Sequence, residues 1–178
     1  QFIDKTHLRS KTFFEQDIVA HIPFANPICT ELNNLLDKVL SKLGISYHSS
    51  GTYICIEGPQ FSTLAESELY RSWGCDIIGM TNMPEAKLAR EAGICYSSLA
   101  MVTDFDCWHP DHEKVTIEQI ISTLNENSSK ALKVVEEVSK CENLNCSQEI
   151  KNIIKNSIVT DLSNVNKKIL EKYKIILD

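Results

Sequence analysis

Three segments of the chain carry residue types that can bind a small polar ligand and act on it. They read Glu57-Gly58-Pro59-Gln60-Phe61-Ser62, Met80-Thr81-Asn82-Met83-Pro84-Glu85 and Thr103-Asp104-Phe105-Asp106. Between them they offer an aromatic ring for a planar base, a hydroxyl beside a helix start for an anion, and paired carboxyl groups. One of the two carboxyl groups is a candidate proton donor if burial favours its neutral form.

Each of these residues also has a simpler structural explanation when it is taken by itself. Thr81 can serve as an ordinary helix cap, and Phe61 can belong to a hydrophobic core. Asp104 and Asp106 can be solvated loop residues. The interpretation therefore depends on the elements that position the three segments.

The apolar residues predict alternating helices and strands around these segments. Thr63 and Glu66 have the spacing of a helix capping box, and so do Thr116 and Gln119. Short β-prone runs predict strands, and Phe2-Ile3-Asp4 reads like the end of another strand. The predicted strands cover 53–57, 75–80 and 94–103, and the predicted helices cover 30–43, 63–74, 84–93 and a long segment from 116.

Apolar strands separated by helices of about ten residues are typical of parallel sheets with right-handed crossovers. We therefore predict an α/β fold, in which ligands bind beyond the carboxyl ends of the strands. All three segments directly follow a predicted strand. Beyond Lys140 the chain is rich in Asn and Lys, and we expect two peripheral helices there.

Composition and charge exclude several classes of protein. With 43% hydrophobic and 24% charged residues the sequence is ordinary for a globular protein. No apolar run approaches the roughly 18 residues of a membrane span. A net charge of -6 without a basic patch argues against binding a nucleic acid polymer.

Cysteine and histidine spacing gives no sign of a metal centre. The seven cysteines form no CxxC pair, which favours reduced thiols and a cytoplasmic location. A bridge between Cys141 and Cys146 stays open, because spacing alone does not decide it. His109 and His112 form an HxxH pair without a third ligand at a recognisable spacing, so we expect no metal site.

Three longer runs resemble the signatures of the trimeric purine nucleoside phosphorylase family. They cover Glu57 to Thr63, Gly79 to Ala86 and Ala100 to Trp108, and the resemblance extends from Gln1 to about Val138. It implies a nucleoside phosphorylase-like α/β fold with a mixed, largely parallel sheet flanked by helices. Residues 1–138 would be the carboxy-terminal part of a single phosphorylase domain that is incomplete at its amino terminus, and 139–178 its helical tail.

The resemblance implies a pentosyl transfer by phosphorolysis. Inorganic phosphate, as co-substrate, attacks the anomeric carbon of a nucleoside and releases a purine and a sugar 1-phosphate, with no metal or organic cofactor. In this family's pattern, Phe61 would pack on the purine and Ser62 would help define the base site. Met80 would hold the ribose, and Thr81 would bind phosphate.

The same resemblance assigns catalysis to Asp104. It would donate a hydrogen bond or proton to the purine ring nitrogen as the glycosidic bond breaks, and Asp106, with Phe105 beside it, would help to read the 6-amino group. Relatives specific for 6-oxopurines typically have Asn at the position of Asp104. Two carboxyl groups therefore favour adenine over hypoxanthine or guanine.

The sugar end of the implied site adds a second indication of the substrate. Where relatives that accept ordinary nucleosides have His, this chain has Ile117, followed by Ile120 and Ile121. An apolar wall leaves a 5′-hydroxyl unpaired but accepts a thioether, a difference of about 1–3 kcal/mol. The expected substrate is S-methyl-5′-thioadenosine, cleaved to adenine and 5-methylthioribose 1-phosphate in purine and methionine salvage. These isoleucines can equally be the buried stripe of their helix.

Two further features of the resemblance concern the assembly. His21 resembles a residue that reaches the sugar pocket of a neighbouring subunit, which implies a homotrimer. The family's glycine-rich phosphate loop and its Arg-His phosphate contacts would precede Gln1. The isolated chain is therefore expected to bind phosphate poorly and to be inactive or unstable.

Other functions remain open at this point. Gly79 stands where some methylthioadenosine-cleaving relatives have Asn, so a purine nucleoside or methylthioinosine phosphorylase is the nearest alternative. A non-catalytic nucleoside-binding module is an alternative of a different class. A third is an α/β interaction domain in which all three runs are structural.

Overall fold

A parallel three-stranded sheet forms the centre of the molecule. The computed structural model describes residues 1–14, 17–110, 116–142 and 147–177. The strands are β1 (Phe2–Lys5), β2 (Tyr53–Ile56) and β3 (Ile77–Gly79), in the order β1-β2-β3. Both pairings are parallel, and they align Ile3 with Ile54 and Ile54 with Ile78. The α/β prediction is confirmed. The strands predicted at Phe2-Ile3-Asp4 and at 53–57 are present as β1 and β2, and β3 is shorter than the predicted 75–80.

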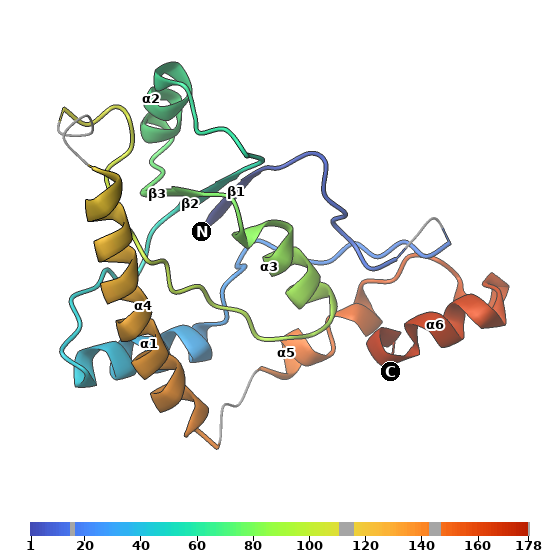
Figure 1. Ribbon diagram of the computed structural model, residues 1–178. Helices are drawn as coiled ribbons and strands as arrows, with labels where there is room; N and C mark the ends of the chain where they lie inside the picture. The colour runs from blue at the N-terminus through green and yellow to red at the C-terminus, as the bar shows by residue number, and fades with distance from the viewer. Residues whose placement is uncertain (15–16, 111–115, 143–146, 178) are drawn as a thin grey trace.

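The helices follow the sequence closely because their start signals are local. Thr63 and Thr116 both form the predicted capping boxes, and Gly44 ends the first helix with a φ of 63° that favours glycine. Figure 1 shows how the helices surround the sheet. The helices are α1 (Thr30–Lys42), α2 (Leu64–Ser72), α3 (Asn82–Glu91), α4 (Ile117–Ser139), α5 (Gln148–Lys151) and α6 (Lys167–Leu177).

The central strand β2 is buried on both faces. Ile54 and Ile56 pack with Tyr70 of α2, whereas Cys55 packs with Met83 and Ala86 of α3. Because successive side chains of a strand point to opposite faces, α2 and α3 cover opposite sides of the sheet. Figure 1 shows the same arrangement, with α2 above the strands and α3 below them.

The long helix α4 is attached to the rest of the molecule mainly through α1. Val134 is 1% exposed and packs with Val39 and Leu40 of α1. An ion pair between Lys42 and Glu137, at 2.6 Å, joins the same two helices. Figure 1 shows the two helices crossing at one side of the molecule.

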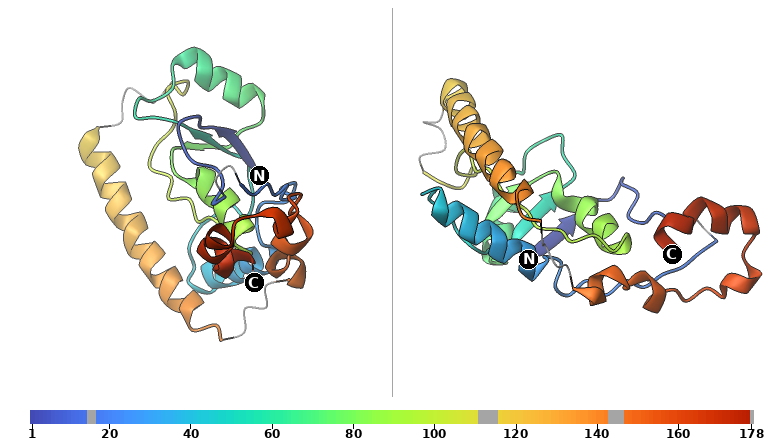
Figure 2. Two further views of the ribbon diagram at one scale, coloured as in Figure 1. Left: turned by 90° about the vertical axis from the view of Figure 1, so that its right-hand side faces the viewer. Right: turned by 90° about the horizontal axis from the view of Figure 1, so that it is seen from below.

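The tail forms a second, smaller core with a segment near the start of the chain. Phe14 and Tyr173 meet edge to face, with ring centroids 5.2 Å apart, and Ala20 forms an antiparallel bridge with Ile158. Figure 2 shows this part lying beside the sheet region. The tail contains two α-helices, α5 and α6, as expected, and Tyr173 of α6 packs with Phe14 and Ile18. The division into 1–138 and 139–178 stays a prediction.

The predicted strand over 94–103 is wrong. These residues are described but pair with none of the three strands. The carbonyl of Tyr96 accepts a hydrogen bond from the amide of Cys29, at 2.8 Å, and that of Val102 accepts one from the Asn127 side chain. A strand needs a neighbouring strand for its hydrogen bonds, and this segment runs past α1 and α4 instead of along the sheet.

The prediction that the cysteines are reduced needs one correction. Cys95 is disulfide-bonded, whereas Cys29, whose sulfur lies 2.8 Å from that of Cys95, is a free thiol. Sequence spacing gives little information on sulfur atoms that the fold brings together. Cys141 is a free thiol, while Cys146 lies outside the described residues. Within the described ranges, no helix is long and apolar enough to cross a membrane.

Candidate active site

The first two segments meet at the carboxyl edge of the sheet. Glu57 to Ser62 follow β2, and Met80 to Glu85 follow β3. Gly58 has a φ of 68°, and a β-carbon at this position would lie 2.6 Å from the sulfur of Met80. Glycine is therefore required here both by the backbone conformation and by the close approach of the Met80 side chain.

Arg9 joins the ends of the two strands, and the sequence reasoning missed it. Its Nη1 donates to the carbonyl oxygens of Met80 and Met83, both at 2.6 Å. Its Nη2 donates to the carbonyl of Glu57 at 2.8 Å, and its Nε to the Glu57 carboxylate at 3.1 Å. A planar guanidinium suits such a set of acceptors because its donors point in fixed directions.

The carboxylate of Glu57 organises the segment that carries Arg9. It accepts hydrogen bonds from the backbone amides of His7, at 2.7 Å, and Leu8, at 3.3 Å. The bonds from these amides, first that of His7, and from Arg9 lower the pKa of Glu57. Glu57 is therefore held as a carboxylate, which suits a positioning role rather than proton donation.

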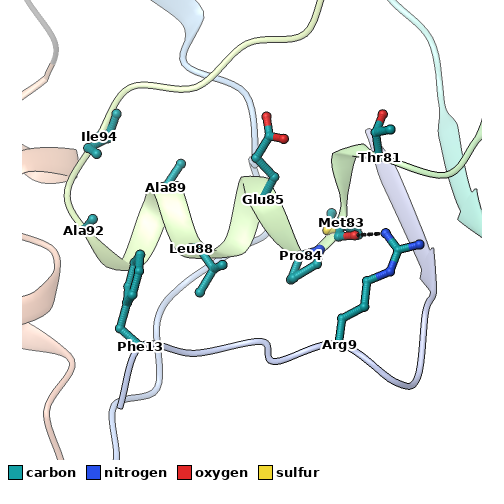
Figure 3. Close-up of a pocket in the computed structure, with 10 residues that line it drawn as sticks. All are labelled: Arg9, Phe13, Thr81, Met83, Pro84, Glu85, Leu88, Ala89, Ala92 and Ile94. Carbon is teal, nitrogen blue, oxygen red and sulfur yellow. Dashed lines mark hydrogen bonds between the residues drawn. The ribbon is translucent and has the colours of Figure 1, made fainter. Parts of the chain in front are cut away.

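Thr81 lies just before the regular part of α3. Met83 has an extended backbone, so the regular helix begins at Pro84, as the proline predicts. The Thr81 side chain makes no capping hydrogen bond and lies 3.5 Å from the Asn82 side-chain oxygen. The simple capping explanation for Thr81 therefore fails. Figure 3 shows Thr81 and Arg9 at one end of a cavity along α3 of about 470 Å³.

The third segment is held against the start of α2. The Cys107 thiol lies 3.2 Å from the Ser67 hydroxyl oxygen and 3.9 Å from the Ser62 carbonyl oxygen. The guanidinium of Arg71 stacks over the Trp108 ring at 4.0 Å from its centroid. These contacts bring the loop after Thr103 to the segment that contains Phe61 and Ser62, although no strand precedes that loop.

The two candidate carboxyl groups are not buried in the way that we expected. Asp104 is exposed and accepts a hydrogen bond from the Thr103 hydroxyl at 2.5 Å. Asp106 is half-buried and accepts one from the amide of Cys107 at 2.8 Å. Between them Phe105 stacks on His109, with ring centroids 4.0 Å apart. The structure presents the Asp104 carboxyl group to solvent, so a proton-donating role depends on what a bound ligand covers.

Phe61 lies outside the hydrophobic core, and the neighbouring Ser62 has a hydroxyl group without a partner among the described residues. Phe61 is 89% exposed, which excludes the core explanation for its side chain. The Ser62 hydroxyl is buried without a hydrogen-bond partner among the described residues. A buried unsatisfied hydroxyl costs free energy, so it calls for a water or ligand partner.

The start of α4 carries the candidate apolar wall. Ile117 is 72% exposed and Ile121 is also exposed, whereas Ile120 is half-buried. The alternative that all three are a buried stripe is therefore wrong for Ile117 and Ile121. His21 is exposed, and its backbone amide donates a hydrogen bond to the carbonyl of Ser157 at 2.8 Å.

The absence of a metal site at the histidine pair stays a prediction. His109 stacks on Phe105, and His112 lies outside the described residues. Within the described ranges, no three His, Cys, Asp or Glu residues gather as metal ligands would.

The parallel sheet and the loops at its carboxyl edge define a nucleoside phosphorylase fold, which solved structures share. A methylthioadenosine phosphorylase from an antarctic soil metagenomic library matches all of this chain with a TM-score of 0.90 and 39% identity, the chain covering 63% of that protein. Methylthioadenosine phosphorylase from Schistosoma mansoni in complex with adenine matches 89% of this chain, with a TM-score of 0.80 and 31% identity, and 64% of it is covered.

Residues 1–140 match the model of the phosphorylase superfamily, and the chain belongs to that family. It is 47% identical over 177 residues to the S-methyl-5′-thioadenosine phosphorylase of Koribacter versatilis, covering 99% of this chain and 61% of that protein. Over 135 residues it is 57% identical to the Rhodospirillum rubrum protein of the same name, covering 76% of this chain and 46% of the relative. The chain thus spans roughly half to three fifths of the length of these relatives.

Proposed function

We propose that this chain carries the nucleoside part of a phosphorylase site that cleaves S-methyl-5′-thioadenosine with phosphate. The products are adenine and 5-methylthioribose 1-phosphate. The observation that carries the proposal is that the segment with the exposed Phe61 and the unpaired Ser62 hydroxyl contacts both the end of β3 and, through Cys107, the loop that contains Asp104. The names of the relatives support the same reaction. Since the chain spans only part of their length, its activity as a whole enzyme is part of the proposal.

The base binds between the first and third segments in this proposal. Phe61 stacks on the purine, and the Ser62 hydroxyl finds in the ligand the partner that it lacks in the free protein. Asp104 donates to the purine ring nitrogen as negative charge develops on the departing base. Asp106, beside Phe105, accepts from the 6-amino group.

The sugar and the phosphate bind along the second segment. Met80 borders the ribose, and the Thr81 hydroxyl, which makes no capping bond, donates to phosphate. Phosphate attacks the anomeric carbon, and the bond to the base nitrogen breaks. The chemistry needs no organic cofactor or metal in this proposal, because both reactants are held by hydrogen bonds and the leaving base is stabilised by Asp104.

The thioether end of the substrate packs on Ile117, Ile120 and Ile121. Their side chains offer no hydrogen-bond partner to a 5′-hydroxyl, so ordinary nucleosides bind less tightly than the methylthio substrate. Preference for the methylthio group therefore follows from the exposed apolar start of α4.

A homotrimer in the cytoplasm completes the proposal. The exposed positions of Leu132 and Val135 on α4, which continue the line of Ile117 and Ile121, support burial against another subunit. His21 is exposed, so it is available to a neighbouring site. Sedimentation equilibrium of the chain gives the mass directly, and a monomer at micromolar concentration contradicts the trimer.

Binding to the 178-residue chain tests the proposed site. Calorimetry with methylthioadenosine, inosine and adenine, each with and without phosphate, is compared for the wild type and Asp104→Ala. Tighter binding of methylthioadenosine than of inosine, weakened by the substitution, supports the proposal. Equal binding of inosine favours a phosphorylase of 6-oxopurine nucleosides. An unchanged affinity in Asp104→Ala favours a purely structural role.

A further inference from the structure

The geometry points to Arg9 as a positioning residue of this site, one that orients the backbone amides of Gly58 and Thr81 at the ends of β2 and β3. This inference rests on the proposed function. It adds a residue from the amino-terminal segment, 48 to 74 positions away in sequence from the groups that it holds.

The hydrogen bonds of Arg9 converge on backbone groups rather than on side chains. Three carbonyl oxygens, those of Glu57, Met80 and Met83, lie 2.6 to 2.8 Å from its two terminal nitrogens. The Arg9 side chain is 25% exposed, so water screens these contacts only in part.

Holding these carbonyl groups fixes the amides on the other side of the same peptide planes. In a trans peptide the C=O and the N–H point in opposite directions. The Met80 carbonyl points to Arg9, so the amide of Thr81 points away from it, and the amide of Gly58 does so for the same reason. Figure 3 shows the Thr81 hydroxyl on the side away from the guanidinium as well. Arg9 thus sets the direction of the Thr81 backbone amide.

The segment that carries Arg9 is itself anchored independently of Thr81. Glu57 accepts the amides of His7 and Leu8, and Lys11 forms an ion pair with Asp4 at 2.8 Å. Lys11 touches neither the end of β2 nor that of β3 in the contacts described. It therefore provides a matched control, a cation two positions away that stabilises the same segment without holding the site.

The test compares Arg9→Gln, Arg9→Lys and the control Lys11→Gln in the 178-residue chain. Dissociation constants are measured for adenine, for methylthioadenosine and for inorganic phosphate, and amide chemical shifts are recorded for Gly58 and Thr81. We expect Arg9→Gln to raise the dissociation constants of methylthioadenosine and phosphate about ten- to hundredfold. Adenine alone, which contacts the first and third segments, keeps its affinity. Arg9→Lys recovers only part of the loss, because a point charge cannot hold three carbonyls in a fork.

A purely structural role for Arg9 would lower the affinity for adenine and methylthioadenosine alike, and that result overturns the inference. Unchanged affinity for methylthioadenosine in Arg9→Gln overturns it too, while leaving the proposed function intact. If the wild type binds none of the three ligands, the proposed function fails, and the amide shifts of Gly58 and Thr81 then decide the positioning role alone. Should Arg9→Gln not fold, the same comparison is made with Arg9→Lys and Glu57→Gln. The inference then requires that these variants lower the affinity for methylthioadenosine and leave that for adenine unchanged.

Discussion

The Cys107 thiol lies 3.2 Å from the Ser67 hydroxyl, and this contact fixes the loop of Asp104 against helix α2. A loop that follows no strand is thereby placed beside the segment that follows β2. The base site proposed here depends on that placement, because Phe61 and Ser62 come from one segment and Asp104 from the other.

Asp104 sets the preference for adenine in this account. We expect Asp104→Ala to weaken adenine binding about tenfold or more, since a hydrogen bond with a carboxyl group is lost. Asp104→Asn should weaken the binding of adenine but strengthen the binding of hypoxanthine, because an amide donates to a 6-oxo group. Calorimetry with both bases checks the two variants. Equal losses for adenine and hypoxanthine in Asp104→Asn contradict the assignment.

Ile117 sets the preference for a thioether. Replacing it with Asn should lower the affinity for methylthioadenosine relative to adenosine by about 1–3 kcal/mol, because a polar group is placed against the methylthio end. Leu132→Asn is the matched control, since both residues lie on α4 and are 72% exposed. If the two variants have the same effect on the ratio of affinities, the apolar wall is not at Ile117.

The attachment of α4 to α1 depends on Val134. Because its side chain is 1% exposed, Val134→Ala should lower the free energy of unfolding by about 2 kcal/mol. The neighbouring Val135 is 63% exposed, so Val135→Ala should change it by less than about 0.5 kcal/mol in a monomer. Urea unfolding followed by circular dichroism measures both. If both variants lower the free energy of unfolding by comparable amounts, Val135 is buried in the assembled protein.

Asp4 makes the stability depend on pH. Burial by itself raises the pKa of Asp4, but hydrogen bonds from Lys11, Lys87 and Thr6 outweigh it and hold that pKa well below its ordinary value of 3.8. A carboxyl group whose pKa is lowered by folding stabilises the fold above its unfolded pKa, and this contribution is lost as pH falls through the folded pKa.

The corresponding variant is Asp4→Asn. At pH 7 it should be less stable than the wild type by about 1–3 kcal/mol, and the difference should shrink progressively below about pH 5. Urea midpoints at several pH values give the difference curve, in which the other carboxyl groups cancel. A difference that stays constant down to about pH 2 contradicts the role of Asp4.

Much of the fold was predictable because its signals are local. The capping residues Thr63 and Thr116, the glycine after α1 and the proline that opens regular α3 each act within a few residues. The strand over 94–103 failed for the opposite reason. Its residues have strand-like composition, but a strand forms only beside a partner, and composition carries no information on whether a partner is present.

The candidate site was predictable in its segments but not in its connections. The order of strands and helices placed Glu57 to Ser62 and Met80 to Glu85 at one edge of the sheet. Arg9 could not be found in this way, because its partners are backbone carbonyls, and any residue type has a carbonyl. The exposure of Asp104 was also missed, since a sequence does not show which side of a loop faces water.

The most direct test of the central claim is a chimeric enzyme. This chain replaces the matching 177 residues of the Koribacter versatilis relative, to which it is 47% identical. Release of adenine from methylthioadenosine is then measured with and without phosphate, with inosine in parallel and the intact relative as control. We predict adenine release that depends on phosphate, with little cleavage of inosine. A folded chimera that cleaves neither nucleoside, or that cleaves inosine equally well, contradicts the proposed function.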